Sequence, residues 1–184
     1  MSVKQKSLTI HGTLVQIYNV GVLFTGPSSV GKSESAVELI MDGHKFIADD
    51  VVLLKSKKNQ LIGTNIGKDK TCWAIEIKGL GIIDISEIFK SSILKETDIT
   101  IEIELYFPKD SKIISGEYLG DVLNWKNYLN VDIIYYRIPV TPGRNIAKIS
   151  ELIVLNYIHF ISKGKSYLSE IDNKIINENL NKKQ

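Results

Sequence analysis

The chain has 184 residues, of which 43% are hydrophobic and 24% charged, which is enough for one soluble globular domain with a buried core. Its 23 Lys and Arg residues nearly balance its 21 Asp and Glu residues, so the formal charge of +2 does not favour nucleic acid as a partner. Cys72 is the single cysteine, which excludes an intramolecular disulfide, and we expect it to be a small core residue.

The sequence shows no targeting or membrane segment. Residues 1–20 contain no continuous apolar stretch like that of a signal peptide, and no stretch is long and apolar enough to cross a bilayer. We therefore expect a cytoplasmic protein that does not bind membranes. No repeat, Gly/Ser-rich linker or abrupt change in composition divides the chain, so we expect one domain over residues 1–184.

The first predicted elements are antiparallel strands over residues 7–24, where apolar and polar residues alternate around Gly12. The strand at residues 22–25 leads into a glycine-flanked loop. A helix is predicted over residues 32–42, because its apolar residues share one face and Gly43 follows as a left-handed cap.

A further strand is predicted from the apolar, β-branched run HKFIADDVVLLK. Asp49 and Asp50 lie inside this run, at the point where the strand would leave the core. The polar stretch over residues 55–70 then predicts a hairpin or a mobile loop.

The clearest period of two in the chain lies at residues 99–107 and predicts a half-buried strand with its threonine and glutamates on the polar face. Residues 131–140 predict another strand, which Pro139 and Pro142 would end. Together with the earlier elements, these strands predict a mixed, twisted α/β domain.

Two helices are predicted at about residues 146–180. Asn145 could cap the first, which would stop at Gly164, and apolar residues at helical spacing predict the second before a polar tail.

The segment GPSSVGKS matches the phosphate-loop pattern G-x-x-x-x-G-K-[ST] and lies where that pattern requires, between a predicted strand and a predicted helix. Glycines let main-chain N–H groups surround phosphate oxygens, and the helix N-terminus adds the positive end of its dipole. Lys32 would reach the β- and γ-phosphates, and Ser33 would supply a hydroxyl ligand for Mg²⁺. The predicted nucleotide-binding residues are Gly26, Pro27, Ser28, Ser29, Val30, Gly31, Lys32 and Ser33. The alternative is a glycine-rich turn with a surface lysine.

Asp49 and Asp50 follow this loop by one helix. A strand in that position normally runs beside the loop's own strand, so its carboxyl end would bring both acids close to the γ-phosphate. Because neighbouring residues of a strand point to opposite faces, we expect one carboxylate to bind metal and the other to accept a proton. For an arbitrary Asp-Asp pair, two strand-end acids facing solvent would be the more ordinary interpretation.

Four segments resemble the C-terminal catalytic domain of the HPr kinase/phosphorylase family, bacterial enzymes that phosphorylate a serine of the phosphocarrier protein HPr. They occur in the family's order and are HGTLVQIYNVGVLFTG, VGKSESAVELIMDGHKFIADDVV, IEIKGLGIIDI and PVTPGRNIA. The resemblance identifies the chain as a stand-alone catalytic domain without the family's N-terminal domain. It implies a phosphate-loop kinase fold of the HPr kinase type, with ATP and Mg²⁺ as cofactors, an HPr-like carrier of the phosphotransferase system as partner, and a hexamer.

The resemblance also assigns residue roles. It implies that Asp49 is the acid-base residue, and that Asp50 and Glu76 complete the metal and polar shell with Ser33. It places His11 in the active site, although a lone strand histidine would otherwise be interpreted as a hydrogen-bonded structural residue.

Two cations complete the implied site. Arg144, in PGRN, would stabilise charge on the transferred phosphoryl group, whereas without the family it would be a solvated turn arginine. Lys78 stands where the family usually has an arginine, so it keeps the charge and loses the planar fork.

The sequence departs from the family pattern at other positions. Pro27 and Ser29 replace an acidic residue and a glycine, and Thr141 replaces a basic residue before PGRN. Because the changes at Lys78 and Thr141 fall in the region associated with the phosphorolytic reaction, kinase activity is the primary prediction and phosphorylase activity a secondary one.

Two alternative functions remain open. One is a kinase for a different protein or for a small-molecule hydroxyl. The other is a nucleotide-sensing module that binds ATP without transferring phosphate, although such a module would have little use for Asp49, Asp50, Glu76 and His11.

Overall fold

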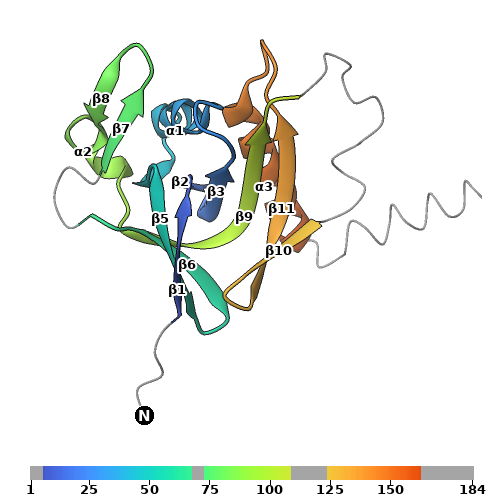
Figure 1. Cartoon of the computed structure of the whole chain (residues 1–184). Helices are drawn as coiled ribbons and strands as arrows, with labels where there is room; N and C mark the ends of the chain where they lie inside the picture. Colours follow the sequence, from blue (N-terminus) through green and yellow to red (C-terminus); the bar gives the residue numbers. More distant parts are fainter. Residues whose placement is uncertain (1–5, 68–72, 109–123, 163–184) are drawn as a thin grey trace, which may run out of the picture.

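The structure is a computed structural model that describes residues 6–67, 73–108 and 124–162. Its main sheet is strongly curved (Figure 1). Nine described strands form this sheet in the order β1-β5-β6-β9-β3-β2-β4, with β11 paired to β9 and β10 paired to β11. The strands β7 and β8 form a separate two-stranded sheet. In chain order the elements are β1 (Ser7–His11), β2 (Thr13–Ile17), β3 (Val20–Thr25), α1 (Lys32–Met41), β4 (Lys45–Ala48), β5 (Val51–Lys57), β6 (Gln60–Asn65), β7 (Ala74–Ile77), β8 (Gly81–Asp84), α2 (Ile85–Ile88), the 3₁₀ helix η2 (Lys90–Ser92), β9 (Glu96–Tyr106), β10 (Asn124–Tyr128), β11 (Val131–Pro139) and α3 (Ile146–Ser162).

The long strand β9 joins two parts of the sheet. Its first residues pair antiparallel with β6, and the rest of the strand pairs in parallel with β3 on one side and β11 on the other. The parallel strands β3, β9 and β11 therefore end at the same edge. This edge carries the loop between β3 and α1.

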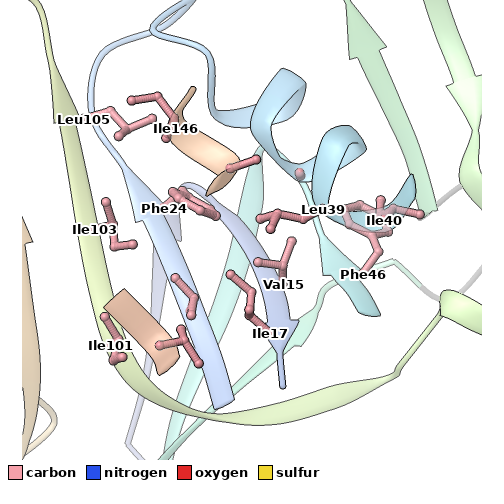
Figure 2. Packing of buried hydrophobic residues seen from close by; sticks show 14 of the residues in the cluster. Val15, Ile17, Phe24, Leu39, Ile40, Phe46, Ile101, Ile103, Leu105 and Ile146 are labelled. Atoms are coloured by element: carbon pink, nitrogen blue, oxygen red, sulfur yellow. The ribbon is translucent and has the colours of Figure 1, made fainter. Parts of the chain in front are cut away.

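The larger core lies between this part of the sheet and the helices α1 and α3. The alternating Ile101, Ile103 and Leu105 of β9 are fully buried there, as the period of two predicts. Burial of each such side chain contributes roughly 1.5–3 kcal/mol. Figure 2 shows this packing, with labelled members Val15, Ile17, Phe24, Leu39, Ile40, Phe46, Ile101, Ile103, Leu105 and Ile146.

Several predicted elements are confirmed. The helix predicted over residues 32–42 is α1, and Gly43 follows it with a φ of 93°. The helix predicted to begin at residue 146 is α3, and Asn145 Oδ1 accepts a hydrogen bond of 2.8 Å from Lys148 N. The polar stretch after residue 55 forms the β5–β6 hairpin, whose turn residues Lys58 and Asn59 both have positive φ.

The predicted strand that contained both aspartates is wrong in two respects. It is broken at Asp49 and Asp50 into β4 and β5. In addition, β4 pairs with β2 and not with β3, whose own neighbours are β2 and β9. Because β2 runs antiparallel to both β3 and β4, β4 still points in the same direction as β3. The carboxyl end of β4 therefore lies at the same edge of the sheet as the phosphate loop, although β2 separates β4 from β3.

The predicted polar face of β9 is not solvent-exposed throughout. Glu102 is fully buried, whereas Phe107, predicted on the apolar face, lies beyond the end of β9 and is 53% exposed. Cys72, Gly164 and the predicted last helix lie outside the described residues. No helix in the described part of the chain is long and apolar enough to span a membrane.

Candidate active site

A cavity of about 550 Å³ lies where β3 ends, α1 begins and β4 turns into β5. The β7–β8 hairpin forms another part of its wall. Ten of the residues predicted from the sequence line it: His11, Ser28, Ser29, Gly31, Lys32, Ser33, Asp49, Asp50, Glu76 and Lys78. Most of the predicted site therefore comes together in one place.

The phosphate loop has the backbone that a glycine-rich turn requires. Gly26 has a φ of 129° and lies against β9, where an added Cβ would be 2.2 Å from the Leu105 carbonyl oxygen. Ser29 and Gly31 are also left-handed, with φ of 59° and 101°. Gly31 is the N-cap of α1, and no side chain caps the helix there. The first N–H groups of α1 are thus available to an anion.

The Lys32 side chain is folded back onto the loop. Its Nζ donates to the carbonyl oxygens of Gly26 (3.2 Å) and Pro27 (2.9 Å), and the residue is only 6% exposed. Burial lowers the pKa of Lys32, although the nearby charges of Asp49, Asp50 and Glu34 oppose this shift. A bound phosphate would supply the counter-charge that favours the ammonium form.

Asp49 accepts hydrogen bonds from two hydroxyl groups. Thr13 Oγ1 of β2 donates to its Oδ1, and Ser33 Oγ of α1 donates to its Oδ2 at 2.8 Å. A serine hydroxyl that donates a hydrogen bond to a carboxylate keeps its oxygen lone pairs available to a cation. The geometry therefore fits Asp49 to orient Ser33 as a metal ligand.

Asp50 adopts a left-handed conformation, with a φ of 66°, in the short turn between β4 and β5. Its carbonyl oxygen accepts from Gly12 N at 3.1 Å and from His11 Nδ1 at 2.9 Å, and its Oδ1 also lies 2.9 Å from His11 Nδ1. Because both oxygens are acceptors, Nδ1 carries the proton. The Asp50 side chain is 76% exposed and lines the cavity, so its carboxylate is accessible to a substrate.

The β7–β8 hairpin supplies Glu76 and Lys78 to the cavity wall, together with the exposed side chain of Ile82. The hairpin is held by Ile75, which is fully buried in the larger core. It therefore places one carboxylate and one ammonium across from the phosphate loop.

Four predicted site residues do not line the cavity. Gly26 and Pro27 shape the loop through their backbone, and Val30 is buried in the core. Arg144 lies in the exposed turn between β11 and α3, where its N–H donates to Thr141 O at 3.1 Å. The structure thus leaves Arg144 outside the cavity.

Among the oxygen-bearing side chains of the cavity wall, Ser33, Asp50 and Glu76 are those that would hold a magnesium ion. Among the residues described, no three His, Cys, Asp or Glu side chains form a metal-binding group by themselves. The chemistry of this donor set fits a cation whose remaining ligands are phosphate oxygens and water.

The sequence prediction missed some residues of the site. Thr13 is fully buried and contacts Asp49, and Glu34, Ala74 and Ile82 line the cavity. Thr13 begins β2, beyond a bend at Gly12 that separates it from His11 at the end of β1, and no motif in the sequence marks it as a site residue.

Comparisons with known proteins agree with this geometry. Residues 4–175 match the sequence model of the family described as "HPr Serine kinase C-terminal domain". HPr kinase/phosphorylase of Malacoplasma penetrans is 38% identical over 166 residues, which cover 90% of this chain and 54% of the relative. The enzyme of the same name from Clostridium tetani is 37% identical, with 95% of this chain and 56% of the relative covered.

A solved structure gives the same result for the fold. The Hpr(Ser) kinase/phosphatase from Coxiella burnetii superposes with a TM-score of 0.74 at 30% identity, over 85% of this chain and 93% of that chain. This match confirms the predicted phosphate-loop kinase fold. The chain spans about half the length of the curated relatives it matches.

Proposed function

This chain belongs to the HPr serine kinase C-terminal domain family, and we propose that it is an ATP- and Mg²⁺-dependent kinase that phosphorylates a serine of HPr or an HPr-like carrier protein. One observation carries this proposal: a single cavity joins a phosphate loop to two aspartates and a histidine. A binding module needs the loop, whereas an accessible Asp50 carboxylate beside His11 also suits a site where a proton must be accepted.

The loop and Lys32 would hold the nucleotide. The uncapped N-terminus of α1 and the Lys32 ammonium provide positive charge for the phosphates. To do so, Lys32 exchanges its bonds to the Gly26 and Pro27 carbonyl oxygens for phosphate oxygens.

Ser33, with Asp50 or Glu76, would hold the magnesium ion, which when bound neutralises charge on the phosphates. Asp49 would keep the Ser33 hydroxyl turned so that its lone pairs face the cation.

The geometry favours Asp50 as the proton acceptor. Both carboxylate oxygens of Asp49 already accept hydrogen bonds from hydroxyl groups. The Asp50 carboxylate is exposed in the cavity and accepts a hydrogen bond from His11 Nδ1. This proposal reverses the sequence-based assignment, in which Asp49 accepts the proton. Asp50 would orient the acceptor hydroxyl and take its proton late in a loose phosphoryl transfer.

Of the two predicted cations, Lys78 lies in the cavity wall and Arg144 does not. Lys78 lines the cavity and can reduce negative charge on the transferred group. Arg144 would contribute only if the turn at residues 141–144 moved toward the cavity.

The direct test combines the protein with labelled ATP, Mg²⁺ and HPr from the same organism and detects serine phosphate on HPr. Labelled HPr is the expected result. ATP binding without labelled HPr would overturn the acceptor, and a screen of cell extract would then search for a different protein or small-molecule hydroxyl. Absence of ATP binding would overturn the kinase class.

Further properties are proposed from the family alone. Incubating serine-phosphorylated HPr with inorganic phosphate tests the secondary phosphorylase activity. We also propose a cytoplasmic hexamer, and light scattering that gives a concentration-independent monomer would exclude that assembly.

A further inference from the structure

An ion pair between a fully buried carboxylate and a half-buried ammonium lies beside the strand that leads into the phosphate loop, outside the cavity. Glu102, in the middle of β9, is fully buried, and its Oε1 accepts a hydrogen bond of 2.7 Å from Lys126 Nζ of β10. The same oxygen accepts 2.6 Å from the hydroxyl of Thr25. The other oxygen, Oε2, is buried and has no hydrogen-bond partner among the described residues.

The ion pair is poorly explained by stability alone. A buried carboxylate is expensive to desolvate, and apolar residues of similar volume are often as stabilising as a buried ion pair. Lys126 offsets part of this penalty by pairing with the Glu102 carboxylate. The rings of Tyr128 and Tyr135, whose centroids lie 5.5 Å and 5.0 Å from the ammonium, stabilise the charge of Lys126 in turn. Burial disfavours the charge of Lys126, but the hydrogen bond to Glu102 raises the pKa of Lys126 above its ordinary value.

Thr25 connects this pair to the loop. It is the last residue of β3, and the next residue is Gly26, which begins the phosphate loop. Gly26 lies so close to β9 that an added Cβ would be 2.2 Å from Leu105 O, and its carbonyl oxygen accepts from Lys32 Nζ. A small displacement of Thr25 would therefore displace the first turn of the loop and the lysine that the loop holds.

We propose that Glu102 and Lys126 are positioning residues for the phosphate loop: the ion pair fixes the Thr25 hydroxyl, and Thr25 fixes the start of the loop. Because the inference assigns a nucleotide to the loop, it rests on the proposed function. None of the three residues lines the cavity, and bound ATP can hold a displaced loop and Lys32 in position, so the effect should fall on nucleotide binding more than on phosphate transfer at saturating ATP.

The ion pair can be removed without leaving an unpaired charge. Lys126→Met alone leaves the Glu102 carboxylate buried without its cation and should be strongly destabilising. The double variant Glu102→Leu/Lys126→Met replaces both partners with apolar side chains and should fold. Thr25→Val removes only the hydroxyl and keeps the branched shape of the side chain.

Three quantities are measured on each variant: the midpoint of urea unfolding, the Kd for ATP, and the split of kcat and KM. We expect the double variant and Thr25→Val each to weaken ATP binding roughly tenfold, as loss of a hydrogen bond to a charged group implies. Their kcat at saturating ATP should stay within about threefold of the parent value. The triple variant should bind ATP no more weakly than Thr25→Val, because the two changes act through one contact.

Arg137→Met is the matched control. It breaks the neighbouring ion pair of 3.3 Å between Arg137 of β11 and Glu104 of β9. The Glu104 carboxylate accepts from Arg137 and Tyr135, whereas the Thr25 hydroxyl donates to Glu102. ATP affinity should remain at the parent value. If the double variant and Thr25→Val bind ATP as tightly as the parent, the ion pair has a structural role only and the inference is overturned.

Amide hydrogen exchange separates this inference from the proposed function. In the parent protein without ligand, the amides of residues 26–33 should exchange several-fold more slowly than in Thr25→Val. A parent that binds no ATP would overturn the proposed function, and the exchange rates would then decide the positioning role. Equal exchange in parent and variant would overturn it.

Discussion

Ser33 Oγ and Asp49 Oδ2 are joined by a hydrogen bond of 2.8 Å that connects the start of α1 to the end of β4. These residues are 16 positions apart in sequence, and β4, which ends just before Asp49, is not a neighbour of the loop's own strand β3. The bond therefore assigns the two adjacent aspartates different surroundings. Both line the cavity, but the Asp49 carboxylate accepts hydrogen bonds from two hydroxyl groups of the protein, whereas the Asp50 carboxylate is largely exposed.

Asp50→Asn should leave ATP binding close to the parent level and reduce phosphate transfer by a factor of about 100 or more, because the amide cannot accept the proton. The measurement is ATP affinity by calorimetry and transfer at saturating ATP. Asp49→Asn is the matched variant, and it should change the dependence on Mg²⁺ concentration more than Asp50→Asn does. If Asp49→Asn alone abolishes transfer at saturating Mg²⁺, the sequence-based assignment of Asp49 as the base is restored.

Lys32→Ala should impair both binding and turnover. The ammonium meets phosphate oxygens in the ground state and in the transition state, so its loss raises the Kd for ATP and lowers kcat. Titrating ATP and then measuring transfer at saturating nucleotide separates the two effects. An unchanged Kd would mean that the lysine remains bound to the Gly26 and Pro27 carbonyl oxygens and never reaches the phosphates.

ATP binding should weaken as the pH rises through the pKa of Lys32, which burial holds below the ordinary 10.5 despite the charges of Asp49 and Asp50. Below that pKa the ammonium is charged and available to phosphate, and above it the neutral amine is not. Calorimetry over a pH series that rises from neutral to the ordinary lysine pKa of 10.5 should therefore show falling affinity and proton uptake on binding. Lys32→Arg should lack this pH dependence, because arginine stays charged. Constant affinity of the parent across the window would contradict the prediction.

Gly26→Ala should destabilise the fold by about 2–4 kcal/mol, since the new Cβ would meet the Leu105 carbonyl oxygen and the φ of 129° disfavours an L side chain. Gly43→Ala is the control. Gly43 is also left-handed, with a φ of 93°, but an added Cβ there meets nothing within 4 Å. Its replacement should cost only about 1 kcal/mol. Urea unfolding measures both, and equal losses would show that the contact with β9 contributes nothing.

The sequence was sufficient for elements that local patterns encode. The phosphate loop, α1, the alternation of β9 and the cap at Asn145 each depend on residues close together in the chain, and each is confirmed. The polar stretch over residues 55–70 predicted a hairpin or a mobile loop, and its described part forms the hairpin between β5 and β6.

Strand pairing and buried charge were beyond such patterns. The insertion of β2 between β3 and β4 depends on contacts between segments, and the apolar residues on both sides of Asp49 and Asp50 conceal the turn. The burial of Glu102 depends on Lys126, which lies 24 positions further along the chain on another strand. A period of two marks a face of a strand, and only the folded chain decides what covers that face.

The strand β9 also determines when this site can come into existence. The strand β3 pairs with β9, with Val22 opposite Ile101. The phosphate loop therefore gains β9 as its neighbour only after the residues between the two strands have been synthesised and β9 has folded back onto β3. Pairings of such high sequence separation form slowly, so assembly of the parallel strands should be late and rate-limiting in folding. A nascent chain that ends before residue 96 would contain the whole phosphate-loop motif but would lack β9, the strand against which the loop packs.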